Sequence, residues 1–182
     1  ILDSADGRVL YRQELKADDA RLILEAGLNY DTTMCIWSDN KLYGNKLNDR
    51  IQEYSQATKV TPFLMPSIDQ LLERGITKIL WYDDISKIQQ IEKKLRETAL
   101  FHNVTFCTSK PFYLEFFSSK VSKATAIDRI GEIYGFTQAE TIAIGDGFND
   151  LSMIRHAALG AAMGNAPDGV KECADYITTR TN

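Results

Sequence analysis

The second part of the sequence alternates regularly between helical and strand patterns, and this alternation constrains the fold more than any other feature. Alternation of this kind favours parallel strands joined by right-handed crossovers. We therefore expect a wound α/β module over residues 118–182. The segments, in the order helix, strand, helix, strand, helix and strand, are 122–134, 140–144, 148–156, 158–162, 167–172 and 174–178.

Residues 1–117 have a different pattern, which predicts an α+β module with its boundary at about 117–120. The clearest amphipathic helix covers residues 84–98, because isoleucine and leucine recur there at steps of three and four residues. The other elements expected before the boundary are strands over 34–37, 76–82, 104–107 and 112–116 and helices over 46–56 and 67–74.

Turn-forming residues divide the first module further. The first eleven residues read as a hairpin with Asp6 and Gly7 at its turn. A short helix over 17–26 is expected to end at Gly27, since glycine is the usual residue after a helix end. Pro62 and Pro66 are expected to break the stretch that follows the helix over 46–56.

Composition excludes several classes of partner. The chain has 182 residues, of which 44% are hydrophobic and 25% charged, so it can bury a core. A net charge of -4 argues against a nucleic-acid surface, which needs clustered cations. No apolar run approaches the roughly 20 residues that cross a bilayer, so we expect no membrane partner. The three widely spaced cysteines fit neither a disulfide framework nor a zinc site and favour a reducing cytoplasm.

The acidic run GDGFND at Gly145–Asp150 closes an apolar strand pattern. Asp146 directly follows that strand, where the carboxyl ends of parallel strands usually bind ligands. A carboxylate there suits Mg²⁺, which prefers oxygen ligands and keeps phosphate oxygens and waters in its shell. Asn149 can donate its amide to an anion, and Asp150 is expected to orient its neighbours. The alternative is a plain strand-to-helix turn, because short Gly-Asp turns are common.

A lysine and a small-residue loop extend this candidate site. Ser122 is a good helix cap, and Lys123 beside it stands where the helix end already favours anions, so both could hold one phosphate. The alternative is a solvated surface lysine. The stretch Ala161–Pro167 ends a small-residue strand in a Gly-Asn turn, either to approach the acidic loop or only to pack tightly. Asp39, Asn40 and Tyr43 follow another strand as a binding loop or an exposed turn.

These residues together resemble the haloacid dehalogenase superfamily, and most of all the Cof-type sugar phosphatases. The resemblance depends on Lys123, on GDGFND, and on the stretches 157–166 and 174–178. It implies part of a Rossmann-like core with parallel strands over 118–182, and an inserted α+β cap over 1–117 that selects the substrate. It also implies a Mg²⁺-dependent phosphomonoester hydrolase that acts on small metabolites, such as sugar phosphates, through an aspartyl-phosphate intermediate.

The resemblance assigns a role to each site residue. Lys123 matches the lysine that stabilises the nucleophile and the phosphoryl group, and Asp146 matches the metal-binding aspartate. Asn149 matches the amide that contacts substrate, and Asp150 matches a supporting acid. Among the cap residues, Asp39, Asn40 and Tyr43 are the ones we expect to influence specificity.

The sequence departs from the family at two points. Ala124 stands where a glycine commonly follows the lysine. More importantly, the family begins with an Asp-x-Asp signature that supplies the nucleophile and the general acid, and these 182 residues contain none. We therefore expect a carboxyl-terminal part of a longer protein that is inactive by itself, since covalent phosphoryl transfer needs a carboxylate nucleophile. Exposed apolar strand edges are expected to favour self-association.

Three functions remain open on the sequence alone. The first is a phosphatase for small phosphorylated metabolites. The second is a binding or regulatory protein for phosphorylated ligands that has lost catalysis. The third is a phosphomutase relative, which would share the chemistry but return the phosphoryl group to a sugar.

Overall fold

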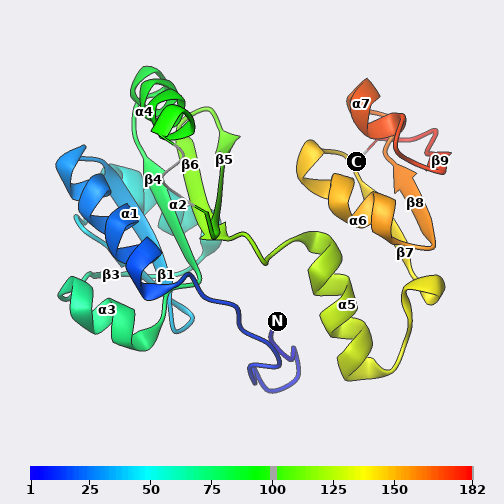
Figure 1. Ribbon diagram of the computed structural model, residues 1–182, viewed down its shortest axis with the longest axis horizontal. Coiled ribbons are helices and arrows are strands. Elements are labelled where there is room, and N and C mark those ends of the chain that lie inside the picture. The colour runs from blue at the N-terminus through cyan, green and yellow to red at the C-terminus, as the bar shows by residue number, and fades with distance from the viewer. Residues whose placement is uncertain (99–101, 182) are drawn as a thin grey trace. The chain divides into compact units, whose positions relative to one another are not determined.

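A computed structural model describes residues 1–98 and 102–181 of the chain (Figure 1). The chain divides into two compact units, which are described separately below. One unit is Gln13–Ser119, and the other combines Ile1–Arg12 with Lys120–Asn182. The first twelve residues thus group with the carboxyl-terminal segment, whereas the cap role expected for residues 1–117 stays a prediction.

The unit Gln13–Ser119 is built on a six-stranded mixed sheet in the order β3-β2-β1-β4-β6-β5. All neighbouring strands in it are antiparallel except β2 and β3, which are parallel. The strands are β1 Thr33–Ser38, β2 Lys41–Gly44, β3 Pro62–Leu64, β4 Lys78–Tyr82, β5 Val104–Lys110 and β6 Tyr113–Ser118.

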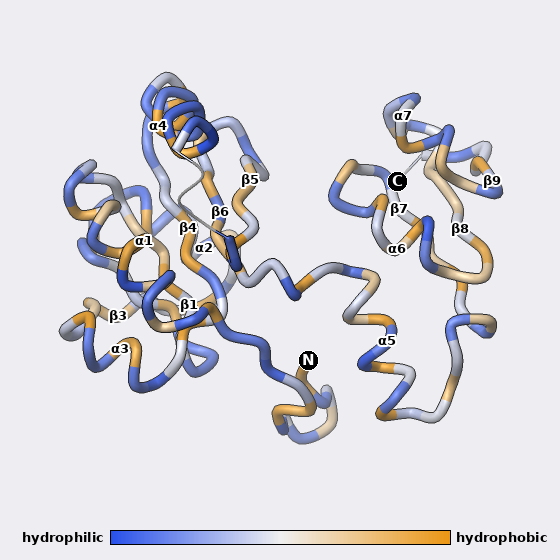
Figure 2. The backbone as a smooth tube through the Cα atoms, in the orientation of Figure 1, coloured by the Kyte–Doolittle hydropathy of each residue, from blue (hydrophilic) through white to orange (hydrophobic). Residues whose placement is uncertain are grey.

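Helices cover this sheet on both faces. The helices are α1 Ala17–Asn29, α2 Asp49–Thr58, α3 Ile68–Arg74 and α4 Ile85–Thr98. Buried residues of α1, α3 and α4 form one core with the face of the sheet that carries Trp81 and Phe116. Ile51 and Tyr54 of α2 pack with Cys35 on the opposite face. Apolar residues recur along α4, which packs one side on the sheet, as the sequence predicts (Figure 2).

Two predictions for this unit are wrong. Gly27 does not end α1 but lies inside it, where the helix packs so closely on the sheet that a Cβ would lie 2.4 Å from the Met34 sulfur. The stretch that contains Pro62 and Pro66 is not wholly irregular, because Pro62 begins the short strand β3. Proline is tolerated as the first residue of an edge strand because its missing N–H need not bond to a neighbour.

The second unit contains a three-stranded parallel sheet in the order β7-β8-β9. The α/β class with parallel strands over the carboxyl-terminal part is therefore confirmed. Ile154 of α6, Ala162 of β8, and Val170 of α7 form its core together with Ala166. The elements are α5 Lys123–Tyr134, η1 Gln138–Glu140, β7 Ile142–Gly145, η2 Phe148–Asp150, α6 Leu151–His156, β8 Leu159–Ala162, α7 Asp168–Lys171 and β9 Tyr176–Ile177.

The amino-terminal residues form a turn in this second unit. Leu2 and Val9 make an isolated antiparallel bridge, and Gly7 in the turn has φ of +73°. Glycine adopts this left-handed conformation without steric cost, which is why the Asp-Gly pair predicts a turn here. The guanidinium of Arg129 on α5 lies 5.3 Å from the centre of the Tyr11 ring. This contact ties the amino-terminal segment to the unit that contains α5.

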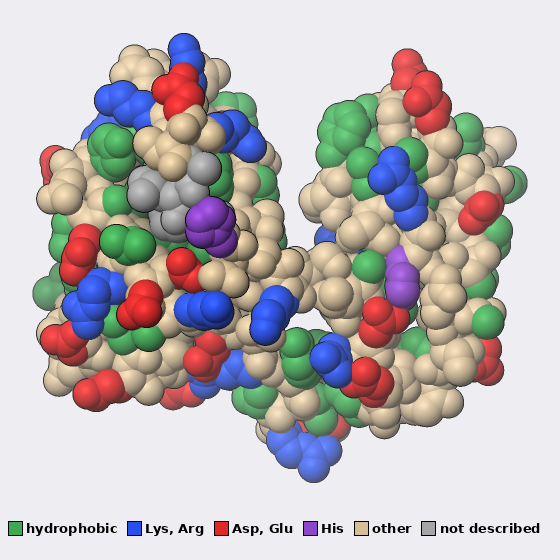
Figure 3. All heavy atoms as spheres, viewed as in Figure 1, with side chains coloured by type: hydrophobic (Ala, Val, Ile, Leu, Met, Phe, Trp, Pro, Cys, Tyr) green, Lys and Arg blue, Asp and Glu red, His purple; other side chains and the backbone are tan. Residues whose placement is uncertain are grey.

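The surface of the Gln13–Ser119 unit mixes charges of both signs, as the face shown in Figure 3 illustrates. Within the described residues, none of the helices combines the length and the apolar character that a membrane span requires.

Candidate functional site

The candidate site begins where β7 ends. The strand alternates exposed and buried residues and delivers Asp146, which is half-buried, to its carboxyl end. The chain then makes the short turn η2, in which the Asp150 N–H donates to the Gly147 carbonyl at 2.9 Å. The predicted helix over 148–156 is thus a 3-10 turn followed by α6. This turn folds the acidic loop back over the end of the strand.

Asp150 organises the loop. Its Oδ2 accepts hydrogen bonds from the backbone N–H groups of Asp146 at 3.0 Å and Gly147 at 3.1 Å. The side chain is buried, and a Cβ at Gly145 would lie 2.3 Å from the Asp150 Cβ, so only glycine leaves room for it. Two backbone donors on one carboxylate fix the direction in which the chain leaves β7, and therefore the position from which Asp146 projects.

Lys123 reaches the same carboxylate from α5. The Asp150 Oδ1 accepts a hydrogen bond from the Lys123 ammonium, which makes an ion pair between residues 27 positions apart. Burial alone would raise the pKa of Asp150, but the hydrogen bonds from Lys123 and from the loop backbone hold that pKa below its ordinary value. Asp150 is therefore a carboxylate at neutral pH.

The start of α5 positions Lys123. Ser122 is the N-cap of the helix, and its hydroxyl accepts from the Thr125 N–H at 3.0 Å while Thr125 Oγ1 accepts from the Ser122 N–H at 2.9 Å. This reciprocal pair is a capping box and confirms the expected helix cap. The Lys123 side chain stays 48% exposed although its partner is buried. The ammonium can therefore contact a ligand while it remains paired.

The small-residue loop after β8 adjoins the acidic loop. The Met163 N–H donates to the Gly145 carbonyl at 2.9 Å, so the two strand ends lie side by side. The Gly164 N–H donates to the Thr178 hydroxyl at 3.0 Å, which fixes the turn after β8. Sequence reasoning missed this role of Thr178, and also the direct pairing of Lys123 with Asp150. The only signal for the pairing was the opposite charge of the two residues.

The other predicted residues are more scattered. Asn149 lies exposed in η2, on the acidic loop. Asp39 and Asn40 lie in the Gln13–Ser119 unit, at the turn between β1 and β2, with φ of 50° and 55°. Tyr43 is buried on β2, where its hydroxyl accepts a hydrogen bond from Arg74 at 2.9 Å. A role of these three cap residues in specificity stays a prediction.

A magnesium ion fits the acidic loop only through Asp146. The described residues include no group of three or more His, Cys, Asp or Glu side chains that could enclose a metal. Magnesium, however, is commonly held by one or two carboxylates with waters and substrate phosphates filling its shell. A single half-buried carboxylate at the carboxyl end of a parallel strand fits that pattern.

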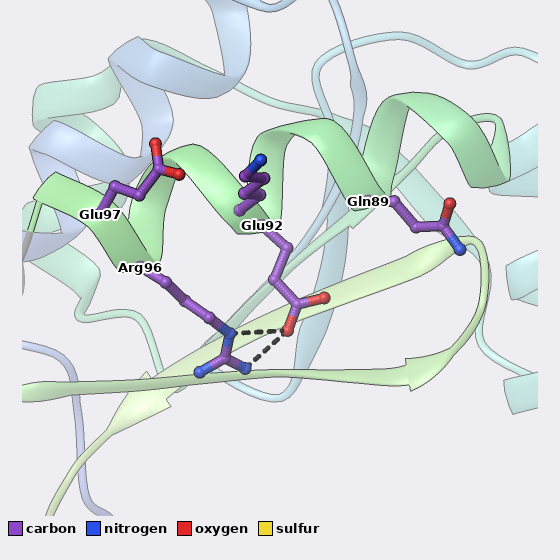
Figure 4. A pocket seen from close by; sticks show the side chains of 5 residues that line it. Gln89, Glu92, Arg96 and Glu97 are labelled. Carbon is purple, nitrogen blue, oxygen red and sulfur yellow. Dashed lines mark hydrogen bonds and ion pairs between the residues drawn. The ribbon is translucent and has the colours of Figure 1, made fainter.

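A pocket also lies in the Gln13–Ser119 unit, on the surface of α4 (Figure 4). It is lined by side chains of that one helix, among them Glu92, Arg96 and Glu97. Arg96 pairs with Glu92 at 2.6 Å, and the second oxygen of Glu92 accepts from the Thr108 hydroxyl at 2.6 Å. These charges neutralise one another on a helix surface, so this pocket does not compete with the acidic loop as a candidate site.

The fold and this geometry define an α/β protein in which an acidic loop and a lysine meet at the ends of parallel strands. The sequence matches the haloacid dehalogenase-like hydrolases over residues 1–182. A Haemophilus influenzae relative is 30% identical over 156 residues, which are 86% of this chain and 56% of that protein. The chain thus spans little more than half of that relative.

Two further comparisons point to similar proteins. The 5-amino-6-(5-phospho-D-ribitylamino)uracil phosphatase YcsE of Bacillus subtilis is 49% identical over 70 residues, which are 38% of this chain and 28% of that protein. The crystal structure of a haloacid dehalogenase-like hydrolase from Bacteroides thetaiotaomicron is similar with a TM-score of 0.82 and 27% identity, and the match covers 97% of this chain and 66% of that one. The chain therefore belongs to the family of haloacid dehalogenase-like hydrolases.

Proposed function

We propose that the protein works as a magnesium-dependent phosphomonoester hydrolase for small phosphorylated metabolites, with sugar phosphates as the main class. The observation that carries this proposal is the cluster at the end of β7. There the carboxylate of Asp150 binds both the Lys123 ammonium and the backbone N–H of Asp146. Asp150 thus positions both a cation, Lys123, and a carboxylate that could bind a metal, Asp146. These are the charges that phosphoryl transfer requires.

Each residue has a distinct part in the proposal. Lys123 binds a phosphoryl oxygen through its exposed ammonium, and Asp150 is the positioning residue that orients it. Asn149 donates its amide to the substrate from η2. Asp146 would hold Mg²⁺ together with waters and phosphate oxygens, and the bound ion would neutralise phosphate charge.

The nucleophile is not among these residues. The family resemblance implies an aspartate that forms an aspartyl-phosphate, but the 182 residues contain no Asp-x-Asp signature. The proposal therefore assigns the nucleophile to a segment outside them and expects these residues alone to bind phosphate without releasing it from esters.

The substrate class is supported by the relatives. YcsE, by its name, acts on a uracil compound that carries a phosphorylated ribityl chain. A small phosphorylated metabolite also agrees with the acidic chain, which lacks the clustered cations of nucleic-acid surfaces. A cytoplasmic location belongs to the same proposal, and the three cysteines, all free in the structure, agree with a reducing compartment.

The test is phosphate release by the protein of the full reading frame that contains these residues. A panel of sugar phosphates is incubated with and without Mg²⁺, for the parent and for Asp146→Asn. Glu172→Gln serves as the matched control, because Glu172 is an exposed acid on the same unit. Release that needs Mg²⁺ and is lost only in Asp146→Asn supports the proposal. Release that is indifferent to Asp146 overturns it.

One observation favours a second candidate. The absence of Asp-x-Asp from the sequence also fits a binding or regulatory protein that recognises phosphorylated ligands without hydrolysing them. That candidate predicts saturable binding of sugar phosphates by the full-length protein and no release of phosphate. A phosphomutase relative would instead transfer the phosphoryl group to an added sugar, which requires separate detection of a new sugar phosphate, because no phosphate is released.

A further inference from the structure

Helix α6 packs closely on the three-stranded sheet, whereas α5 does not. Ile154 of α6 is buried with Ala162 of β8, and a Cβ at Gly160 of β8 would lie 2.1 Å from the Ile154 carbonyl oxygen. In α5, the whole of which the structure describes, Gly131 is the only buried residue. Packing therefore fixes the position of α6 more firmly than that of α5.

The space between α5 and β7 is open. A pocket of about 240 Å³ lies there and is lined by Ile127 and Ile130 of α5 and by Ile142 of β7. The side chain of Ile142 is 68% exposed, so the helix does not cover this strand. Polar contacts therefore have a large part in setting where α5 lies.

Two polar side-chain contacts join α5 to α6, one at each end of α6. At its start, the Asp150 carboxylate accepts from the Lys123 ammonium. At its last residue, His156 Nε2 lies 2.6 Å from Asp128 Oδ1. Because Lys123 and Asp128 both belong to α5, the second contact helps to hold the helix that carries the lysine.

The same histidine is also tied to the segment that follows α5. The side-chain amide of Gln138, on η1, donates to the His156 backbone carbonyl. The end of α6 is thus bound to α5 through the imidazole and to η1 through the carbonyl oxygen. Both partners belong to the stretch that runs from α5 to the start of β7.

The charged groups next to this contact in the chain have partners of their own. Arg155 donates to the Cys173 sulfur at 2.9 Å. Glu132, one turn after Asp128 on α5, pairs with Arg129 of the same helix at 2.6 Å. Asp128 is therefore the carboxylate in contact with the imidazole, and this contact is strongest when the imidazole is protonated.

We propose that Asp128 and His156 are positioning residues for the acidic-loop site. By holding α5 against α6 they keep the Lys123 ammonium at Asp150, since packed helices shift largely as rigid bodies. The imidazole is 29% and the carboxylate 48% exposed, and such a pair contributes little to global stability. Its role is therefore measured through the position of Lys123. The link to catalysis rests on the proposed function, but the contact between the helices does not.

The first readout needs no catalysis. The backbone N–H groups of Asp146 and Gly147 donate to Asp150, so their ¹⁵N–¹H signals in the 182-residue protein report whether Lys123 still pairs with that carboxylate. Lys123→Met gives the signal positions of the loop without the ion pair. These positions are the reference for every other variant.

The variants that break the second contact should mimic the loss of the first. At pH 5.5, Asp128→Asn and His156→Gln should each move both signals toward the Lys123→Met positions. Glu132→Gln is the matched control, because it removes an ion pair within α5 that does not reach α6, and it should leave both signals in place.

The dependence on pH separates positioning from a general effect on folding. Histidine ordinarily changes charge between pH 5 and 8. As the pH rises through this range, the two signals of the parent should therefore move toward the Lys123→Met positions. His156→Lys keeps a positive charge over the whole range, so its signals should stay at the positions that the parent has at pH 5.5.

The second readout is kcat/KM for a sugar phosphate in the protein of the full reading frame. Asp128→Asn should lower it about threefold or more at pH 5.5, and the difference from the parent should narrow toward pH 8. Glu132→Gln should match the parent throughout. Shifted signals with an unchanged kcat/KM would overturn the link to catalysis.

Failure of this proposal and failure of the proposed function are distinguishable. Loop signals that ignore Asp128 and His156, or that follow pH equally in the parent and in His156→Lys, would overturn the positioning role whether or not the protein is a hydrolase. Signals that move as expected, in a protein that releases no phosphate with Mg²⁺, would support the contact between the helices and overturn the proposed function alone.

Discussion

Lys123 at the start of α5 and Asp150 at the start of α6 are joined by an ion pair, although 27 positions separate them in the sequence. Because Asp150 also accepts from the N–H groups of Asp146 and Gly147, one carboxylate fixes both a cation and the acidic loop. The relative positions of Lys123 and Asp146 therefore depend on Asp150. This dependence makes the site open to direct mutational tests.

Replacing Asp150 with asparagine should loosen the loop. An amide keeps the shape but removes the charge that pairs with Lys123 and that strengthens the hydrogen bonds from the loop N–H groups, and hydrogen bonds to a charged group contribute about 1.5–3 kcal/mol. The expected result is a lower free energy of opening for β7 and β8, measured by native-state hydrogen exchange of their amides. Glu172→Gln should leave those amides unchanged. Equal protection in Asp150→Asn and the parent would contradict the anchoring role of Asp150.

The same carboxylate predicts a dependence of stability on pH. The pKa of Asp150 is lowered from 3.8 in the folded protein, so its contribution to stability is complete above that value and is lost as the pH falls through the lowered pKa. Urea denaturation followed by circular dichroism should therefore show a steeper loss of stability below about pH 4 in the parent than in Asp150→Asn. Parallel curves for the two proteins would argue against this linkage.

Gly145 is predicted to accept no side chain. A Cβ there would lie 2.3 Å from the Asp150 Cβ, so Gly145→Ala must displace Asp150 or the strand end. Overpacking of this kind costs about 1–3 kcal/mol, and here it should also separate Lys123 from its partner. Gly169→Ala in α7 is the control, because its nearest neighbour would be a Phe148 ring carbon at 3.4 Å. Equal thermal stability of Gly145→Ala and Gly169→Ala would count against the close approach of Gly145 to Asp150.

In the Gln13–Ser119 unit, two adjacent acids should differ in their effect on stability. Asp83 is buried and pairs with Arg50 and with Lys87, each at 2.7 Å, whereas Asp84 is 78% exposed and pairs with Arg50 at 2.6 Å. Asp83→Asn should cost about 2 kcal/mol, since the two cations are only partly desolvated, and Asp84→Asn less than about 1 kcal/mol.

The fluorescence of Trp37 and Trp81, both of which lie in this unit, reports its urea unfolding. Arg50 contacts both acids, so the two variants differ in the burial of the acid and in the further pairing of Asp83 with Lys87. Equal destabilisation by the two substitutions would show that neither the burial of Asp83 nor its second cation matters.

Much of the fold follows from local sequence patterns. The periodicity of residues 84–98 predicts α4, and Ser122 predicts the start of α5, because amphipathic spacing and capping are local properties. The parallel arrangement of β7 and β8 follows from the alternation of elements, which leaves little choice of connection.

Other features depend on contacts that local patterns do not encode. Gly27 lies inside α1, where Met34 and Trp81 leave no room for a Cβ, so this glycine permits close packing and does not mark a helix end. The sequence pair Asp39-Asn40 is a signal for a two-residue hairpin turn that was overlooked. Both central residues of such a turn have positive φ, as Asp39 and Asn40 do. Recognising it would have placed Tyr43 on β2.

In the site, the sequence indicates which residues matter but not how they connect. Asp146 and Lys123 stand out by their positions after a strand and at a helix start. Their connection through Asp150 could not be predicted, because the distance between α5 and the acidic loop is set by tertiary packing. The ion pair between Lys78 and Glu115 was likewise missed, since it joins residues of β4 and β6 that lie far apart in the sequence.

A double-mutant cycle tests most directly whether Asp146 and Lys123 act on the same bound phosphate. In the protein of the full reading frame, kcat/KM for a sugar phosphate is measured for Asp146→Asn, Lys123→Met and the double variant, with circular dichroism as a check on folding. Each single change should lower kcat/KM by about 100-fold or more. The double variant should lose little beyond either single variant, because groups that act as a unit are not additive. Losses that multiply would contradict the shared site.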